Sequence, residues 1–132
     1  MSEKAKGTFT AAAWDEQTHR ELDGDSKLNK ASVTQEFTGD FEGSGAWDAV
    51  LFCDQDGRSS YTGLQHFTGT LGGRSGSFVA RADGAFDGTE ARSEWTVLPG
   101  SGTGDLEGLR GTGVASATST PPGSYTFDYE LG

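Results

Sequence analysis

The sequence is poor in cysteine, proline, histidine and positive charge. Its 132 residues include 1 Cys, 3 Pro and 2 His, and 10 Lys and Arg stand against 20 Asp and Glu, which gives a formal net charge of -10. The single thiol, Cys53, excludes an intrachain disulfide and a multi-thiolate metal site, and its simplest interpretation is a small buried hydrophobe. The acidic excess repels phosphate backbones and anionic lipid head groups, so we expect neither nucleic acid nor a membrane as partner.

The chain also lacks a long apolar segment. No run of apolar residues approaches the roughly 20 that a membrane-spanning helix needs. The stretch Met1–Lys4 lacks the charged and then apolar pattern of a signal peptide, so we expect a cytoplasmic protein. The length suits one domain over residues 1–132 with one core, in which residues 1–5 are frayed.

Helical periodicity is nearly absent, whereas alternation of apolar and polar residues between glycine-containing turns recurs along the whole chain. We predict strands near residues 6–14, 27–38, 44–54, 58–70, 75–85, 89–98, 111–119 and 124–131. Eight short-linked strands favour an all-β, antiparallel up-and-down barrel, because closure removes the edge strands of an open sheet. The polar stretch 15–25 is predicted as a connection, and the glycine-rich stretch 100–110 as a loop with one helical turn that Thr103 caps.

Hairpin turns predict which residues face each other. A two-residue turn at Gly72 and Gly73 pairs Phe67 with Phe78, Gln65 with Ala80 and Gly63 with Ala82. A three-residue loop at 55–57 pairs Leu51 with Tyr61, Ala49 with Gly63 and Trp47 with Gln65, and a two-residue turn at Asp87 and Gly88 pairs Ala80 with Trp95 and Ala82 with Ser93. All three turns place the same alternate residues inside the barrel.

The inward rows differ in size, which predicts a cavity. Trp47, Trp95 and Tyr61 would wall it and Phe67 and Phe78 would form its floor. The candidate substrate-binding residues are Trp47, Trp95, Phe67, Phe78, Ala49, Gly63, Ala82, Ser93 and Leu51. The alternative is a filled interior, in which Tyr125, Phe127 and Tyr129 from the last strand occupy the space.

Two long motifs resemble the bacterial DUF3224 family. They are the run from Gly63 to Phe78 and the run from Trp95 to Gly111, and the segments 31–40 and 125–129 also fit. The resemblance implies an allene-oxide-cyclase-like, calycin-type barrel of eight strands. Relatives by fold include allene oxide cyclase and the barrel cyclases of spirotetronate biosynthesis, which enclose a flexible hydrophobic substrate without a cofactor.

The chain departs from the family pattern at two interior positions. The pattern commonly carries a glutamate where this chain has Gln65 and a histidine where it has Ala82. An amide cannot act as a general acid or base near neutral pH, so proton transfer by such a pair is not expected here.

Three residues are the candidates for chemistry: Gln65, Tyr61 and Glu36. Glu36 faces inward with Ser32 and Thr34, or outward while Val33, Gln35 and Phe37 fill the interior, and hydrophobicity favours the outward orientation. Facing inward beside Trp47, its carboxylate would be the best general acid or base in the chain.

The other motifs predict no further site. His19 and His66 are interpreted as surface residues, the acidic runs at 23–26 and 54–56 lack the spacing of a calcium loop, and no phosphate-binding motif follows the glycines of 100–104. We therefore expect neither a metal nor a cofactor.

The sequence favours a barrel that encloses an apolar or flexible small molecule. A cofactor-independent cyclase or isomerase that templates its substrate is the first hypothesis, and a non-catalytic carrier is the second. An outward apolar strip on neighbouring strands, made by Val50, Phe52, Val79 and Leu64, predicts a homodimer or larger homo-oligomer.

Overall fold

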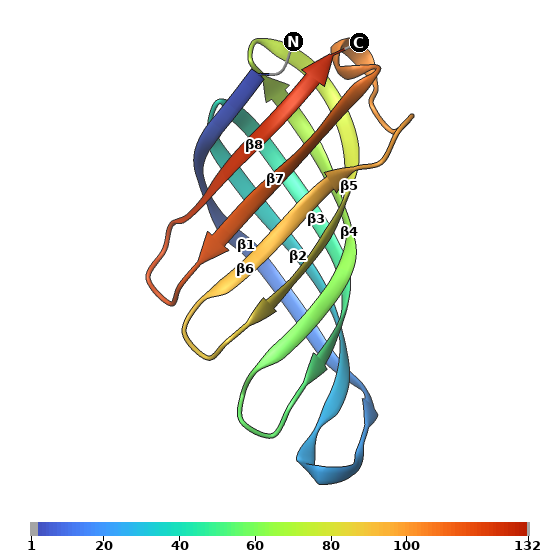
Figure 1. The fold of residues 1–132 in the computed structure, drawn as a ribbon, viewed down its shortest axis with the longest axis vertical. Helices are drawn as coiled ribbons and strands as arrows, with labels where there is room; N and C mark the ends of the chain where they lie inside the picture. Colours follow the sequence, from blue (N-terminus) through green and yellow to red (C-terminus); the bar gives the residue numbers. More distant parts are fainter. Residues whose placement is uncertain (1–2, 132) are drawn as a thin grey trace.

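The computed structural model describes residues 3–131, which form an all-β, closed, antiparallel barrel of eight strands in chain order (Figure 1). The strands are β1 (Glu3–Glu21), β2 (Lys27–Gly39), β3 (Phe41–Cys53), β4 (Ser59–Leu71), β5 (Arg74–Phe86), β6 (Ala91–Val97), β7 (Leu109–Ala117) and β8 (Gly123–Leu131). Two single 3-10 turns, η1 (Asp23–Asp25) and η2 (Gly104–Leu106), lie in the connections. The predicted fold class is confirmed.

The two ends of the barrel differ. One end carries the β2–β3, β4–β5 and β6–β7 connections and the packed side chains of Phe41, Leu71 and Leu106, and we call it the packed end. The other end carries the four remaining hairpin tips, and we call it the open end. Figure 1 shows these tips descending stepwise from β7–β8 to β1–β2, so the β1–β2 hairpin projects beyond the rest of the wall.

Barrel closure covers only the first part of β1. β1 pairs with β8 from Glu3 to Phe9, opposite Tyr129 to Gly123, whereas its pairing with β2 continues to Glu21. From Thr10 onward one edge of β1 therefore has no β8 partner. The inward-facing residues of β1 from Ala11 onward are exposed at the open end, whereas Asn29, Ala31 and Val33 on β2 are buried.

The first strand is longer than predicted. Residues 15–21, predicted as a polar connection, continue β1 through two register irregularities, at Ala11/Ala13 and Thr18/Arg20. Alternation failed as a guide because residues 11–21 are exposed on both faces. The prediction of a frayed start is wrong for Glu3–Ala5, which pair with β8, and Met1 and Ser2 lie outside the described residues.

Two turns agree with prediction and a third does not. Gly72 and Gly73 form the two-residue β4–β5 turn, both with positive φ, and the β3–β4 loop closes between Asp54 and Arg58. The β5–β6 connection spans four residues, because the Asp87 carboxylate accepts the backbone N–H groups of Thr89 and Glu90 at 2.9 and 2.8 Å. β6 is consequently shifted by two residues, so Ala82 faces Trp95 and Ala80 faces Val97. A shift of two keeps the predicted inward residues inward.

The predicted helical turn is present at η2, but its predicted cap is wrong. Thr103 occupies the residue before the turn, yet its hydroxyl makes no capping hydrogen bond. It lies 2.6 Å from the hydroxyl of Ser77 and accepts the Ser77 backbone N–H at 3.1 Å. This contact joins the β6–β7 connection to β5 and places Leu106, fully buried, against the packed end.

The Tyr125 hydroxyl links β8 to the β2–β3 turn. It accepts the backbone N–H of Phe41 at 2.9 Å and lies 3.1 Å from the carbonyl oxygens of Thr38 and Phe41, to which it can donate. Gly7 makes this approach possible, since a Cβ there would lie 2.6 Å from the Tyr125 oxygen. The Tyr125 hydroxyl therefore links β8 to the turn between β2 and β3, which is distant in sequence.

We predict that Tyr125→Phe lowers the free energy of unfolding by about 1–3 kcal/mol, because the buried N–H of Phe41 loses its acceptor. Urea unfolding followed by tryptophan fluorescence measures the change. Thr126→Val is the matched control, since it removes an exposed hydroxyl from the same strand and should shift the midpoint little. Equal stabilities for Tyr125→Phe and the control would contradict the assigned role of the phenol.

Candidate functional site

Strand pairing arranges the interior in rows that cross the barrel wall. One row runs Trp14, Val33, Trp47, Gln65, Ala80 and Val97. The next runs Glu16, Ala31, Ala49, Gly63, Ala82 and Trp95, and the third runs Thr18, Asn29, Leu51, Tyr61, Gly84 and Ser93. Paired residues on neighbouring strands point to the same face, so these rows line the inside of the wall.

Aromatic rings fill the packed end. Phe67 stacks on Phe78 with ring centroids 4.7 Å apart, and Phe127 also stacks on Phe78, with ring centroids 5.9 Å apart. Trp95 lies 5.0 Å from Phe67 and 5.9 Å from Tyr125. The space left among these rings is about 10 Å³, close to that of a single water molecule. The predicted cavity floor is therefore solid core, and the alternative with rings from β8 inside is correct at this end.

The side chains of Trp47 and Tyr61 lie across the row of small residues Ala49, Gly63 and Ala82. They do not form the walls of an empty cavity, as the sequence predicted. The Trp47 indole N–H reaches the Ala82 carbonyl oxygen on β5 at 3.4 Å. The Tyr61 ring contacts Trp47 edge-on at 5.1 Å, and its hydroxyl lies 3.1 Å from the Ser93 hydroxyl on β6. A Cβ at Gly84 would lie 2.9 Å from the Tyr61 ring. The small residues thus provide the space that the rings of Trp47 and Tyr61 occupy.

Gln65 lies at the centre of the barrel and is buried. Its side-chain N–H group donates to the side-chain oxygen of Gln35 on β2. Gly45 allows this contact, because a Cβ there would lie 2.8 Å from the Gln65 nitrogen. One donor of the amide is therefore committed to a second amide, in a polar layer between the packed end and the open end.

Glu36 lies apart from the other candidate residues. It is exposed on the outer face opposite Thr10 and Ser44, while Val33 and Phe37 are buried inside. The orientation that hydrophobicity favoured is the observed one. Glu36 is therefore no interior acid or base. The remaining candidates, Ala49, Gly63, Ala82, Leu51 and Ser93, lie inside the barrel near Trp47 and Tyr61.

The open end contains residues that sequence reasoning missed. Trp14 lies on the inner face opposite buried Val33, yet it is 57% exposed, because β8 does not extend over it. Glu16 follows on the same face and accepts the Trp14 indole N–H at 3.0 Å and the Asn29 amide N–H at 2.6 Å. A signal for these residues was present in β2, where Asn29 alternates with Ala31 and Val33 and so faces the interior with them. The residues of β1 that pair with these three must also face inward.

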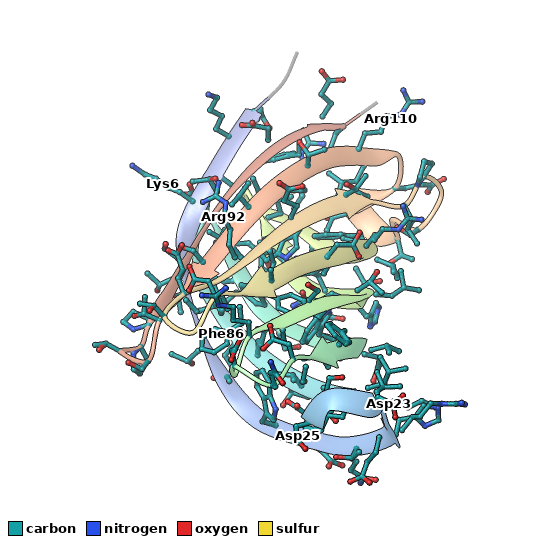
Figure 2. The ribbon with its side chains drawn as sticks, turned by 60° about the horizontal axis from the view of Figure 1, so that its bottom comes forward. Lys6, Asp23, Asp25, Phe86, Arg92 and Arg110 are labelled. Atoms are coloured by element: carbon teal, nitrogen blue, oxygen red, sulfur yellow. The ribbon has the colours of Figure 1, made fainter. Side chains whose placement is uncertain are left out.

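Cys53 lies at the rim of the open end and packs against the hydrophobic core, but the predicted buried hydrophobe is only half-buried. Burial raises the pKa of its thiol, the charge of Glu16 raises it further, and Lys27 acts in the opposite direction. The thiol therefore remains protonated near neutral pH. Figure 2, turned so that the open end comes forward, shows Phe86 near this rim and Asp23 and Asp25 at the projecting β1–β2 tip.

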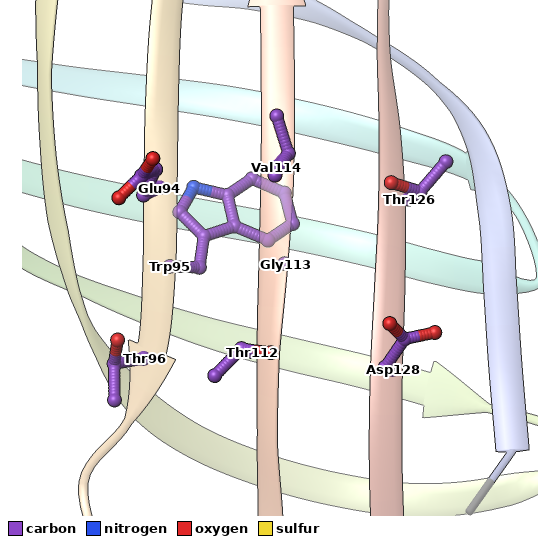
Figure 3. Close-up of a pocket in the computed structure, with 8 residues that line it drawn as sticks. All are labelled: Glu94, Trp95, Thr96, Thr112, Gly113, Val114, Thr126 and Asp128. Carbon is purple, nitrogen blue, oxygen red and sulfur yellow. The ribbon is translucent and has the colours of Figure 1, made fainter.

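A depression of about 280 Å³ lies on the outer face of β6, β7 and β8 (Figure 3). Its lining consists of Glu94, Trp95, Thr96, Thr112, Gly113, Val114, Thr126 and Asp128. Trp95 reaches it from the interior beneath Gly113, where a Cβ would lie 3.0 Å from the indole. The depression is open to solvent, and its lining mixes hydroxyl groups and two carboxylates with the apolar side chains of Trp95 and Val114.

Within residues 3–131, no group of three or more His, Cys, Asp or Glu side chains is arranged to hold a metal ion. Over the same residues the structure contains no helix with the length and apolar character to cross a membrane.

Comparisons with known proteins extend over nearly the whole chain. The family model DUF3224, described as a protein of unknown function, matches residues 5–129. The crystal structure of a protein of unknown function from the same family, from Shewanella oneidensis MR-1, superposes with a TM-score of 0.84. The two sequences are 24% identical, and the match covers 100% of this chain and 99% of that one, so the likeness shows a shared fold. No curated protein matches the sequence.

We predict that alkaline pH destabilises the barrel through Tyr61. Burial raises the pKa of this phenol above its ordinary value, and the hydrogen bond with Ser93 offsets part of the increase. The unfolded chain then releases its proton at lower pH than the folded chain. The stabilisation is therefore complete below pH about 10 and is lost as the pH rises through the folded-state pKa.

Urea unfolding at a series of pH values from about 9 to 11, the range in which a phenol titrates, measures this effect. The free energy of unfolding should fall less steeply with pH for Tyr61→Phe than for the unaltered protein. Tyr125 and Tyr129, whose pKa values burial also raises, account for the slope that remains. Parallel curves for the two proteins would show that the Tyr61 phenol does not couple to folding.

Proposed function

The chain belongs to the DUF3224 family, whose description names no function, and from the geometry of the open end we propose that it is a small-molecule-binding barrel. The observation that carries the proposal is the exposed indole of Trp14 on the inner face. A large aromatic side chain exposed on the inner face of a barrel wall offers an apolar surface of the kind that ligand sites use.

The neighbouring side chains support this position. Trp14, Val33 and Trp47 are cross-strand neighbours on β1, β2 and β3, so an apolar row leads from the uncovered hairpin into the barrel. The next row inside the wall carries only Ala31 and Ala49 on β2 and β3. These two alanines are buried, so the surface that a ligand can reach is the exposed indole of Trp14 together with the adjacent, exposed side chain of Glu16.

The geometry favours binding over catalysis. Within the barrel the candidate groups are the Tyr61 phenol, which stays protonated at neutral pH, and the Gln65 amide, which is joined to Gln35. The Tyr61 hydroxyl also lies 3.5 and 3.4 Å from the carbonyl oxygens of Ala85 and Arg92. A cyclase or isomerase that acts by holding the reactive conformer is the alternative, with Tyr61 as the group that stabilises developing charge.

We predict that 1-naphthylmethanol, a neutral aromatic probe, binds the barrel and that Trp14→Ala weakens this binding about tenfold through loss of the exposed ring. Isothermal titration calorimetry measures the affinity. The variant should remain folded, since Trp14 packs little of its surface against the core.

Phe52→Ala is the matched control for this experiment. Phe52 is also a largely exposed aromatic residue, but it lies on the outer face of β3. The control should bind the probe as the unaltered protein does. A failure of the probe to bind, or an equal loss in both variants, would contradict a site on the inner face.

Self-association is a separate proposal that rests on the outer face of β3 and β4. Val50, Phe52 and Leu64 are each 42–48% exposed there and lie on neighbouring strands. Val79, expected in the same strip, is partly covered by the β6–β7 connection, whose Ser101 hydroxyl accepts its backbone N–H at 3.0 Å. The apolar patch is therefore smaller than predicted and consists of the three residues on β3 and β4.

We predict that the protein forms a homodimer through this patch and that the double variant Phe52→Glu, Leu64→Glu is monomeric, because buried like charges oppose association. Analytical ultracentrifugation over a concentration series measures the mass. A monomeric unaltered protein at every concentration would exclude the dimer, and a dimeric double variant would place the interface elsewhere.

A further inference from the structure

The open end holds a carboxylate that two neighbouring side chains orient. Glu16 lies on the inner face of β1 opposite Ala31. One of its oxygens accepts the Trp14 indole N–H at 3.0 Å and the other accepts the Asn29 amide N–H at 2.6 Å. Both donors are fixed on strands of the hairpin, so the carboxylate has a defined direction on the uncovered face.

Asn29 leaves an acceptor without a partner. The residue is 5% exposed, and because a carboxylate can only accept, its amide must turn the N–H group toward Glu16 and the oxygen away from it. That oxygen is buried and has no hydrogen-bond partner among the described residues. A buried acceptor of this kind is expected to have a partner in the functional state of a protein.

We propose that Glu16 and Asn29 bind the protonated amine of a small aromatic or apolar amine, whose apolar part lies along the exposed indole of Trp14. This assignment rests on the proposed binding function and names its ligand class. An ammonium group has three donors and no acceptor, which matches the Glu16 carboxylate and the free Asn29 oxygen. The exposed indole of Trp14 offers an apolar surface to the rest of the ligand.

The surrounding charges agree with a cationic ligand. The whole chain carries a formal charge of -10, which attracts cations and repels carboxylates. Lys27 lies opposite Glu21 on β1 and Cys53 on β3, one row farther toward the rim than Asn29. The other basic residues of this hairpin, Arg20 and Lys30, pair with Leu28 and Gln17, outside the rows that contain Glu16 and Asn29. A carboxylic acid of the same shape would meet the Glu16 charge and leave the Asn29 oxygen without a donor.

The test compares two probes of nearly the same shape, 1-naphthylmethylamine and 1-naphthylmethanol, by isothermal titration calorimetry at low salt. The amine should bind the unaltered protein about tenfold or more tightly than the alcohol, as expected for a charge-assisted hydrogen bond. Glu16→Gln should remove this preference by lowering the affinity for the amine about tenfold, to that of the alcohol. Retained alcohol binding also shows that the variant is folded.

Asp15→Asn is the matched control, because it removes the same charge from the adjacent, outward-facing residue of β1. It should change the affinity for the amine by less than about twofold, as screened surface charges do. An equal loss in Asp15→Asn and Glu16→Gln would overturn the site and attribute the preference to net charge.

The remaining outcomes separate this inference from the proposed function. Equal affinities of the two probes, with no effect of Glu16→Gln, would overturn the amine assignment while the binding barrel stands. Failure of both probes to bind would overturn the barrel's binding function and the amine assignment together.

Discussion

The constraint on which the rest of the structure depends is the short closure of the barrel, which in residues 3–131 consists of seven residue pairs between β1 and β8. It joins the two ends of the chain at the packed end, where the Tyr125 hydroxyl ties β8 to the β2–β3 turn. Beyond Phe9, the second half of β1 follows β2 without β8. The same seam therefore produces a solid aromatic core at one end and an uncovered inner face at the other.

Glycine and alanine have a different role from the one their size suggests. In a barrel wall, glycine and alanine let strands approach closely and leave space inside the barrel. From the sequence pattern alone, this space is interpreted as a cavity. Here large rings from other strands enter that space: Tyr61 lies over Gly84, and Trp95 and Phe127 lie over Gly113. Polar contacts hold the rings in these positions, as in the hydrogen bond from the Trp47 indole N–H to the Ala82 carbonyl oxygen. The surface for which we propose binding therefore lies at the open end, away from the rings of β8.

Much of the local structure could be predicted because it depends on neighbours in sequence. The glycine turn at 72–73 specifies the pairing of Phe67 with Phe78, and alternation along β2 specifies the burial of Val33 and Phe37. The β6 register could not be predicted, since it depends on the Asp87 carboxylate capturing two N–H groups and lengthening the turn. The hydrogen bonds among Trp14, Glu16 and Asn29 could not be predicted, because residues 11–21 are exposed and do not alternate between apolar and polar side chains.

The sequence by itself determined an acidic, all-β, eight-stranded barrel and the residues that face its interior, because turn chemistry and period-two alternation are local properties. Only the tertiary structure decided whether that interior is filled, because filling depends on how far side chains from non-adjacent strands reach across the barrel. It also decided where β8 stops covering β1. That length follows from the stagger of all eight strands and leaves Trp14 exposed beside the Glu16 carboxylate.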